Sequence, residues 1–276
     1  MTDKYAVIGN PISHSKSPLI HEAFAKQTNQ DISYERILAP LGGFEATVRD
    51  LIAKGYKGVN VTVPFKFEAF NLATKHSNRA INAGAANTLT FNDEICAENT
   101  DGAGIVRDIE ENLNVKFAGK EVLLLGAGGA AEGVLHPILE TNPLLLVIAN
   151  RSLDKALSMV KKVEVQQAHM LTTLTGQTFE NLETQQFDII INATSAGLTD
   201  TSLPIPNTIF ARGCLAYDMM YGRETPFMKQ ARESGAQVVD GLGMLVEQAA
   251  EAFYIWRGVR PETQDVMQMI RNLPKS

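Results

Sequence analysis

Short runs of apolar residues alternate along this chain with longer segments in which apolar and polar residues are mixed. The clearest case is residues 121–152, where the apolar runs Val122–Leu125 and Leu144–Ala149 flank a glycine-rich turn and a predicted helix over Ala130–Glu140. Continuous apolar runs of this length are typical of strands buried on both faces of a parallel sheet. The segment therefore predicts a β-α-β unit.

The turn of this unit has the spacing G-x-G-x-x-A, with Gly126, Gly128 and Ala131 at the three small positions. In such a turn the first glycine permits a tight bend and the second lets a phosphate approach the backbone. The third small residue lets the helix pack closely on the sheet. Free N–H groups at the start of that helix point toward a bound pyrophosphate. With a strand before the turn and a helix and strand after it, the pattern predicts a dinucleotide-binding site.

The end of the second apolar run indicates which dinucleotide binds. Sites for NAD usually carry Asp or Glu there, to accept hydrogen bonds from the ribose hydroxyls. This chain instead has Asn150, Arg151 and Ser152, followed by Lys155. Arg151 can bind a 2′-phosphate with two hydrogen bonds and Lys155 can add a point charge, which favours NADP over NAD. The alternative is that both cations are solvated at the start of a surface helix, with Ser152 as its N-cap.

A separate alternation of strands and helices precedes this unit. Strands are predicted over Tyr5–Gly9, Ile32–Leu38 and Gly58–Val63, and helices over Pro18–Lys26 and Gly43–Lys54. Ser17 is a natural N-cap for the first helix, and Pro18 suits its first position. Alternating strands and helices indicate a mostly parallel sheet. Because this sheet is complete before the dinucleotide unit begins, it belongs to a separate domain.

The rest of the pattern completes two domains. A hairpin is predicted from Leu89–Phe91 and Ile95–Ala97, strands over Phe187–Ile191, Leu215–Met219 and Gln237–Asp240, and helices over Ala103–Asn112, Leu245–Trp256 and Gln264–Asn272. We expect the last helices to pack back on the first domain. That domain would then consist of residues 1–101 and 245–276, and the dinucleotide-binding domain of residues 102–244.

Composition narrows the class of protein. Of 276 residues, 45% are hydrophobic and 20% are charged, as in an ordinary globular protein. The net charge of −6 argues against broad nucleic-acid binding. Cys96 and Cys214 lack metal-ligand spacing and indicate a reducing compartment, and no cluster of carboxylates or of Cys and His indicates a metal. Without a signal-peptide pattern or a membrane-spanning apolar run, we expect a cytoplasmic protein with no membrane partner.

Hydroxyl and amide side chains gather after the strands of the first domain. Ser13, Ser15 and Ser17 follow the first strand, and Asn60, Thr62 and Lys66 lie in or after the third. Ligands of open α/β sheets bind outside the carboxyl ends of the strands. Each of these residues alone is more often a cap or turn former. Together they predict a site for a small molecule with several hydroxyls and a carboxylate.

Several motifs occur in a fixed order over nearly the whole chain. They are GNPISHSKSP (9–18), NVTVPFK (60–66), GAANT (84–88), NTDG (99–102), GAGGA (126–130), NR (150–151), NATSAG (192–197) and DGLGMLVEQA (240–249). As a set they resemble the shikimate dehydrogenase family. The resemblance implies an α/β protein of two domains, an N-terminal, mostly parallel α/β substrate domain and a Rossmann-like NADP-binding domain. The active site would lie in the cleft between them.

The resemblance also implies an activity and the residues that perform it. The activity is the reversible, NADPH-dependent reduction of 3-dehydroshikimate to shikimate in aromatic amino-acid biosynthesis, with Lys66 and Asp101 as the catalytic pair. The residues implied to bind substrate are Ser15 and Ser17 at the carboxylate and Thr62, Asn87, Gln248 and Tyr221 at the ring. Those implied to bind the cofactor are Gly126, Ala127, Gly128, Gly129 and Ala130 at the pyrophosphate, Asn150, Arg151, Ser152 and Lys155 at the 2′-phosphate, and Thr194, Met219 and Gly241 at the nicotinamide.

The chain departs from the family pattern at Glu132 and Lys155, where many members carry a basic residue and an arginine. Two other interpretations stay open. The first is a quinate/shikimate dehydrogenase with relaxed cofactor use, for which Asp154 near Arg151 is a hint. The second is a non-catalytic NADP-binding or regulatory protein, which is expected to lack Lys66 or Asp101. Either a monomer or a homodimer is compatible with the resemblance.

Overall fold

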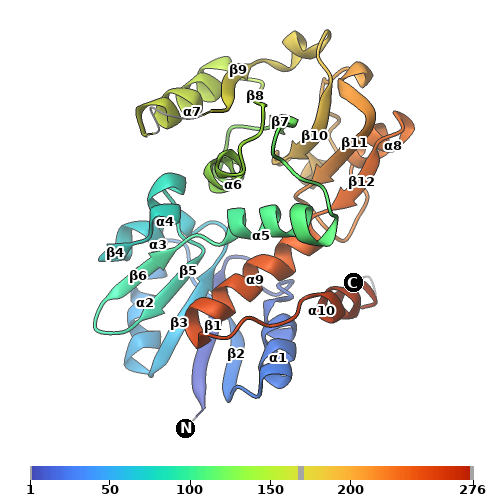
Figure 1. The fold of residues 1–276 in the computed structure, drawn as a ribbon. Helices are drawn as coiled ribbons and strands as arrows, with labels where there is room; N and C mark the ends of the chain where they lie inside the picture. Colours follow the sequence, from blue (N-terminus) through green and yellow to red (C-terminus); the bar gives the residue numbers. More distant parts are fainter. Residues whose placement is uncertain (1, 167–170, 274–276) are drawn as a thin grey trace. The chain divides into compact units, whose positions relative to one another are not determined.

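The computed structural model describes residues 2–166 and 171–273, and the chain divides into two compact units (Figure 1). The first unit comprises Met1–Ile105 and Leu245–Ser276, and the second comprises Val106–Met244. Each unit contains its own sheet, so the expectation of an α/β protein with two sheets is confirmed.

The first unit contains a mixed sheet with the strand order β2-β1-β3-β5-β6-β4. Its strands are β1 (Asp3–Gly9), β2 (Ile32–Leu38), β3 (Tyr56–Val61), β4 (Lys75–His76), β5 (Thr88–Phe91) and β6 (Ile95–Glu98). Its helices are α1 (Ser17–Thr28), α2 (Phe44–Ala53), α3 (Lys66–Leu72), α4 (Asn78–Ala83) and α10 (Gln264–Arg271), while α5 (Asp101–Arg107) and α9 (Leu242–Arg257) contain the two boundaries between the units. β1 pairs in parallel with β2 and β3, which agrees with the predicted mostly parallel sheet, and β5 and β6 form the predicted antiparallel hairpin.

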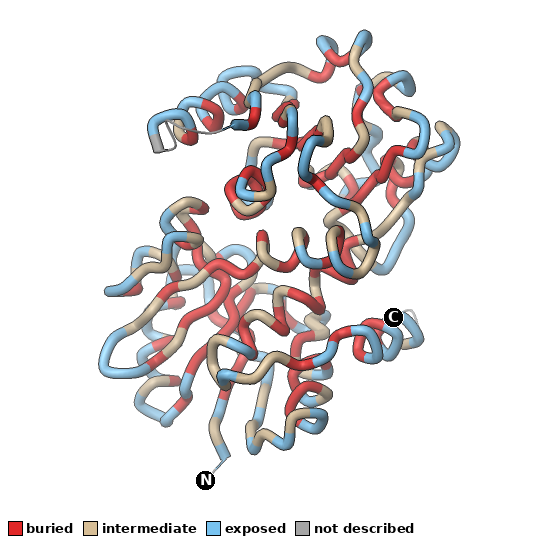
Figure 2. Tube along the Cα trace, viewed as in Figure 1, coloured by how far each residue is buried: buried red, intermediate tan, exposed pale blue. Residues whose placement is uncertain are grey.

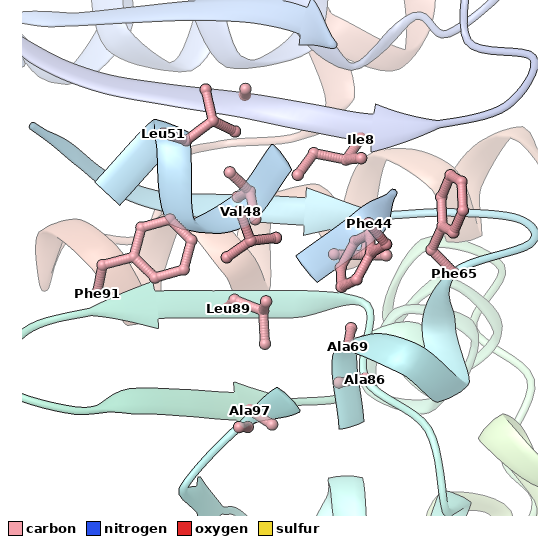
Figure 3. Close-up of a cluster of buried hydrophobic side chains, with 14 of the residues drawn as sticks. Ile8, Phe44, Val48, Leu51, Phe65, Ala69, Ala86, Leu89, Phe91 and Ala97 are labelled. Atoms are coloured by element: carbon pink, nitrogen blue, oxygen red, sulfur yellow. The ribbon is translucent and has the colours of Figure 1, made fainter. Parts of the chain in front are cut away.

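Alternate residues of β1 face opposite sides of this sheet. Ala6 and Ile8 join a buried cluster with Val48 and Leu51 of α2 and Leu89 of β5 (Figure 3). On the opposite face, the ring of Tyr5 stacks on that of Trp256 of α9, with the ring centroids 4.6 Å apart. The sheet is therefore covered by α2 on one side and by α9 on the other.

The second unit is a parallel sheet with the strand order β12-β11-β10-β7-β8-β9. Its strands are β7 (Glu121–Leu125), β8 (Leu145–Ala149), β9 (Thr173–Gln177), β10 (Phe187–Asn192), β11 (Phe210–Asp218) and β12 (Gln237–Asp240). Its helices are α6 (Gly129–Glu140), α7 (Leu153–Gln166) and α8 (Pro226–Glu233), and a π-helical turn covers Asp108–Asn112. The predicted β-α-β unit is confirmed as β7, α6 and β8, and Val122–Leu125 are fully buried (Figure 2).

The order of this sheet reverses at β7, because β8 lies on one side of it and β10 on the other. Ligands of doubly wound sheets bind outside the carboxyl ends of the strands at such a switch point. The turn after β7 and the segment after β10 therefore flank the expected position of a ligand.

The prediction that Ser17 caps α1 is wrong. The helix begins at Ser17 itself, Lys16 occupies the N-cap position, and the Lys16 side chain makes no capping hydrogen bond. The predicted helix over Ala103–Asn112 instead begins at Asp101 and ends as α-helix at Arg107. Sequence reasoning also missed α3, α4, β4, β9 and α8.

Candidate active site and cofactor site

Lys66 and Asp101 form an ion pair within the first unit. Lys66 is the first residue of α3, after β3, and Asp101 is the first residue of α5, after β6. Lys66 Nζ donates a hydrogen bond to Asp101 Oδ2 at 2.5 Å. The side chains retain 30% and 14% of their exposure, so the pair is accessible to a small molecule but partly shielded from water. Two residues 35 positions apart in sequence are thus brought together as the resemblance implies.

The buried side chain of Asn87 connects this pair to its surroundings. Its amide nitrogen lies 2.9 Å from Asp101 Oδ1, 2.9 Å from Thr100 Oγ1 and 3.3 Å from Gln248 Oε1. Its amide oxygen accepts a hydrogen bond from the Thr100 backbone N–H at 2.9 Å. Both Asp101 carboxylate oxygens are therefore engaged, one by Lys66 and one by Asn87, which fixes the carboxylate and through it the ammonium.

The serine loop, residues 12–17, lies at the carboxyl end of β1. Ser15 Oγ donates to Ser17 Oγ at 3.2 Å, and Ser15 Oγ accepts from the Ser17 backbone N–H at 3.3 Å. Arg36 of β2 holds this loop with two donors on the Ser15 carbonyl oxygen, at 2.8 and 2.6 Å. Ser17 is buried and Ser15 is half-buried.

Thr62 lies at the same edge of the sheet as the serine loop. Its backbone N–H donates to the Ile8 carbonyl at 2.9 Å, and the Asn10 N–H donates to the Val63 carbonyl at 3.1 Å. The segments that follow β1 and β3 are therefore neighbours. Within the described residues, the Thr62 hydroxyl makes no hydrogen bond, so it can serve a ligand.

The second unit contains a pocket of about 760 Å³ at the switch point of its sheet. Its wall includes the glycine turn from Gly126 to Ala130, the cations Arg151 and Lys155, and the segment from Ala193 to Ala196 after β10. Asn150 and Thr194 also line it. The structure thus brings most of the residues implied to bind the cofactor around one cavity.

The geometry of the glycine turn suits an anion. Gly126 has φ +106°, a conformation that favours glycine, and a Cβ there would lie 3.2 Å from the Ala193 carbonyl oxygen. A Cβ on Gly128 would meet nothing within 4 Å, so its backbone is open to the pocket. Gly128 is the N-cap of α6 and provides no side-chain acceptor. The first N–H groups of a 12-residue helix are therefore available to a phosphate.

The two cations beside the pocket are free to bind a second anion. Arg151 and Lys155 are exposed, and neither has an ion pair or hydrogen bond within the described residues. None of the described residues lining the pocket is acidic. Asn150 Nδ2 donates to the Ser152 carbonyl oxygen at 3.0 Å, which shapes the turn, while the Ser152 side chain is not part of the pocket wall.

Met219 and Gly241 do not line this pocket, but they lie against each other. A Cβ on Gly241 would lie 2.3 Å from the Met219 carbonyl oxygen, and the Gly241 N–H donates to the Met220 carbonyl at 2.9 Å. Any larger residue at 241 would displace the backbone that carries Met219. Tyr221, two residues after Met219, is half-buried, and burial raises the pKa of its phenol, so the phenol stays protonated at neutral pH and can donate a hydrogen bond.

Sequence reasoning missed Asp218, which organises the segments beside the pocket. This fully buried carboxylate accepts hydrogen bonds from Asn192 Nδ2 at 3.0 Å, from Thr225 Oγ1 at 2.5 Å and from the Met220 N–H at 2.9 Å. Asn192 Oδ1 in turn accepts from Thr194 Oγ1 at 2.7 Å. Asp218 therefore positions Thr194 through Asn192. The only signal was its place at the end of an apolar strand.

Two further kinds of feature are absent from the part of the chain that the structure describes. In residues 2–166 and 171–273, no three His, Cys, Asp or Glu side chains gather as metal ligands would. Over the same residues, no helix combines the length and apolar character needed to cross a membrane.

Three family models match successive parts of the chain. They are the shikimate dehydrogenase substrate binding domain at residues 7–89, shikimate / quinate 5-dehydrogenase at residues 108–199, and the shikimate 5'-dehydrogenase C-terminal domain at residues 241–271. The first match contains Lys66 of the ion pair. The second contains the glycine turn, Arg151 and Lys155.

Individual proteins resemble the chain over its whole length. A shikimate dehydrogenase (NADP(+)) from Methylobacillus flagellatus is 62% identical over 98% of this chain and 99% of its own. The crystal structure of an Ael1 enzyme from Pseudomonas putida has 49% identity and a TM-score of 0.93, with 100% of both chains covered. That of shikimate 5-dehydrogenase from Thermus thermophilus, in complex with NADP(H) and shikimate, has 28% identity and a TM-score of 0.85 over 98% of this chain and 99% of that one. With 62% identity to a relative across nearly all of both chains, the protein belongs to the shikimate dehydrogenase family.

Proposed function

We propose that this protein is an NADP-dependent shikimate dehydrogenase, which interconverts 3-dehydroshikimate and shikimate. The observation that carries the proposal is the Lys66–Asp101 ion pair, whose carboxylate Asn87 holds, in a member of this family. A non-catalytic relative is expected to lack this arrangement, in which the partly shielded ammonium of Lys66 lies beside the fixed carboxylate of Asp101. The proposal extends to a cytoplasmic enzyme of aromatic amino-acid biosynthesis that acts as a monomer or homodimer.

The residues of the second unit fit NADP. The open backbone at Gly128 and the uncapped start of α6 suit the pyrophosphate. Arg151 and Lys155 are unpaired within the described residues, so no internal carboxylate competes with a 2′-phosphate for them. Thr194, Met219 and Gly241 are proposed to form the nicotinamide end, with Asp218 fixing the first of them. When bound, the nicotinamide supplies or accepts the hydride.

Residues of the first unit give the proton to the substrate oxygen or take it back. Reduction of the 3-keto group places negative charge on its oxygen, which requires a donor within hydrogen-bond reach. The Lys66 ammonium has three protons and uses one on Asp101, so others remain for a ligand. In the reverse direction the neutral amine accepts the proton of the hydroxyl. Asp101 stabilises the charged form of Lys66 and aims it.

The remaining residues of the first unit are proposed to orient the substrate. Ser15 and Ser17 donate to the carboxylate from the loop that Arg36 anchors. The unengaged hydroxyl of Thr62 and the amides of Asn87 and Gln248 bind the ring hydroxyls, and Tyr221 is proposed as a further ligand of the ring. Hydroxyls and amides at fixed positions discriminate well, because a ligand lacking the matching group leaves buried polar atoms unpaired.

The test is a steady-state assay of the purified protein with shikimate and with quinate, each with NADP and with NAD, followed by absorbance of the reduced nicotinamide. The proposal predicts that the value of kcat/KM is highest for shikimate with NADP. Higher values for quinate or for NAD contradict the assigned specificity. Absence of turnover in all four combinations contradicts an enzymatic function.

A further inference from the structure

Asn99 lies two residues before Asp101 and is buried, with 3% of its surface exposed. Its amide oxygen accepts a hydrogen bond from the Asp101 backbone N–H at 3.1 Å, and its amide nitrogen donates to the Ala85 carbonyl oxygen at 3.1 Å. Asp101 is the first residue of α5, so its N–H has no partner within the helix. Asn99 therefore connects the backbone of Asp101 to a segment 14 positions before Asn99 in the chain.

The segment that contains Ala85 also holds the other member of the pair. The Ala86 N–H donates to the Lys66 carbonyl oxygen at 3.0 Å. Lys66 Nζ in turn donates to Asp101 Oδ2 at 2.5 Å. Hydrogen bonds thus join Lys66, Ala86, Ala85, Asn99 and Asp101 into one closed circuit, in which Asn99 is the side chain that links the two backbones.

Residues 85–87 are a firm support for this circuit, because all three are buried and hydrogen-bonded to two strands. The Asn87 carbonyl oxygen accepts from the N–H of Val61, the last residue of β3, at 2.8 Å. The Asn87 N–H donates to the carbonyl oxygen of Glu98, the last residue of β6, at 3.1 Å. Since the Asn87 amide also binds the Asp101 carboxylate, the same segment fixes both the backbone and the side chain of Asp101.

These contacts exceed those of a simple turn. Asparagine often accepts a hydrogen bond from the backbone N–H two residues further on, and such a turn uses only the amide oxygen. Here the amide nitrogen is used as well, on a carbonyl oxygen of a different segment. Loss of the Asn99 amide leaves two backbone groups without their partner, the Asp101 N–H and the Ala85 carbonyl.

We propose that Asn99 is a positioning residue for the reaction, which holds the Asp101 backbone where its carboxylate meets the Lys66 ammonium. This inference rests on the proposed function, because it takes Lys66 as the proton donor and Asp101 as its partner. Asn99 acts through Asp101. Because a displacement of 1 Å in the reacting groups can slow a chemical step by about 10²-fold, a loosened pair should affect chemistry more than binding.

Asn99→Ala removes both hydrogen bonds and keeps the contact of Asn87 with the Asp101 carboxylate. We expect the rate of hydride transfer to fall about ten- to a hundredfold. The Kd for shikimate should change by less than about threefold, and the Kd for NADP by less than about twofold, because the serine loop and the second unit keep their contacts.

The experiment is a double-mutant cycle on wild type, Asn99→Ala, Asp101→Asn and the double variant. The rate of NADP reduction by saturating shikimate is followed by absorbance in single turnovers with the enzyme in excess over NADP, and both Kd values come from calorimetric titration. If Asn99 acts through the Asp101 carboxylate, Asn99→Ala should change the single-turnover rate by less than about twofold in the Asp101→Asn background.

Two further variants keep the test decisive. Val48→Ala is the control for general loss of stability, since it removes part of a fully buried side chain of the same unit outside the circuit (Figure 3). It should lower the melting temperature and leave the single-turnover rate within about twofold of wild type. Asn99→Ser replaces Asn99→Ala if the latter does not fold. Serine can accept from the Asp101 N–H but lacks the amide nitrogen that binds Ala85, so the rate should fall by about fivefold, the value of one typical hydrogen bond.

The outcomes distinguish the inference from the function on which it rests. A wild-type rate in the folded position-99 variant, or equal factors for that variant in the two backgrounds, overturns the positioning role. A similar loss of rate in Val48→Ala also overturns it, since a general loosening of the unit then explains the result. Failure of the wild type to oxidise shikimate with NADP contradicts the proposed function itself, whereas an active wild type with an unaltered rate in the position-99 variant contradicts this inference alone.

Discussion

Replacement of Arg151 by alanine should lower the preference for NADP over NAD by about tenfold. Arg151 follows β8, lines the pocket of the second unit and has no internal partner within the described residues. Its guanidinium is therefore available for a 2′-phosphate, the only group that distinguishes NADP from NAD. Arg151→Ala removes this contact while leaving the glycine turn that binds the shared pyrophosphate.

The size of the effect follows from the exposure of the side chain. A hydrogen bond to a charged group contributes about 1.5–3 kcal/mol, and exposure favours the lower end of that range because water screens the pair. A loss of about 1.5 kcal/mol corresponds to a roughly tenfold rise in the KM for NADP. Lys155, a point charge without the planar fork of arginine, should contribute less.

The assay is the initial rate of shikimate oxidation as a function of NADP and, separately, of NAD. Arg151→Ala should raise the KM for NADP by about tenfold and change that for NAD by less than about twofold. Arg212→Ala is the matched control, since it removes an exposed arginine of the same unit that does not line the pocket. Equal losses with NADP and NAD refute the assignment of Arg151 to the 2′-phosphate.

Three further predictions concern binding and stability. Ser15→Ala combined with Ser17→Ala should weaken shikimate binding in calorimetry while NADP affinity persists; unchanged shikimate affinity refutes a carboxylate site in the serine loop. Glu132 lies in the first turn of α6, so Glu132→Gln should lower the KM for NADP and NAD alike, and a change for one cofactor only contradicts a pyrophosphate-side effect. The pKa of His21 falls from 6.5 to about 3 on folding, so its stabilising contribution is full above pH 6.5 and is lost as the pH falls toward 3. The wild type should therefore lose about 2 kcal/mol of unfolding free energy between pH 7.5 and 5 through this residue, and His21→Phe should lose correspondingly less. The measurement is urea titration of both proteins at the two pH values. The same pH dependence in both contradicts a buried neutral imidazole.

The elements that sequence predicts best are those with long uninterrupted patterns. The predicted β-α-β unit matches β7, α6 and β8 to within a residue at every end, because fully buried parallel strands give continuous apolar runs. Short elements give no such signal. The helices α3 and α4 have seven and six residues, too few for helical periodicity to appear. The sequence TLTGQ of β9 is polar because β9 is an edge strand.

The sequence indicates which residues gather at the site. It indicates less well how those residues contact one another. That Lys66 and Asp101 follow strands is predictable from the sequence, but their 2.5 Å contact depends on where α3 and α5 begin in the fold. Ser17 was predicted to cap α1, whereas the structure uses its backbone and hydroxyl in contacts with Ser15. Tyr34 escaped notice because an aromatic residue in an alternating strand is ordinary. Its hydroxyl donates to Asn60 Oδ1 at 2.7 Å, a contact between β2 and β3 that only the fold brings about.

The kcat for shikimate oxidation with NADP in wild type and Lys66→Ala tests the central claim most directly, with Lys57→Ala as the control because it removes an exposed lysine of β3. General acid–base catalysis typically contributes about 10²–10⁴-fold, so Lys66→Ala should lower kcat by that factor with a smaller change in the KM for shikimate. Asp101→Asn should also lower kcat, and the double variant should lose less than the product of the two single losses, because the pair acts as a unit. A folded Lys66→Ala enzyme with near-normal kcat contradicts the assignment and transfers the proton role to another group, of which Tyr221 is the first to test.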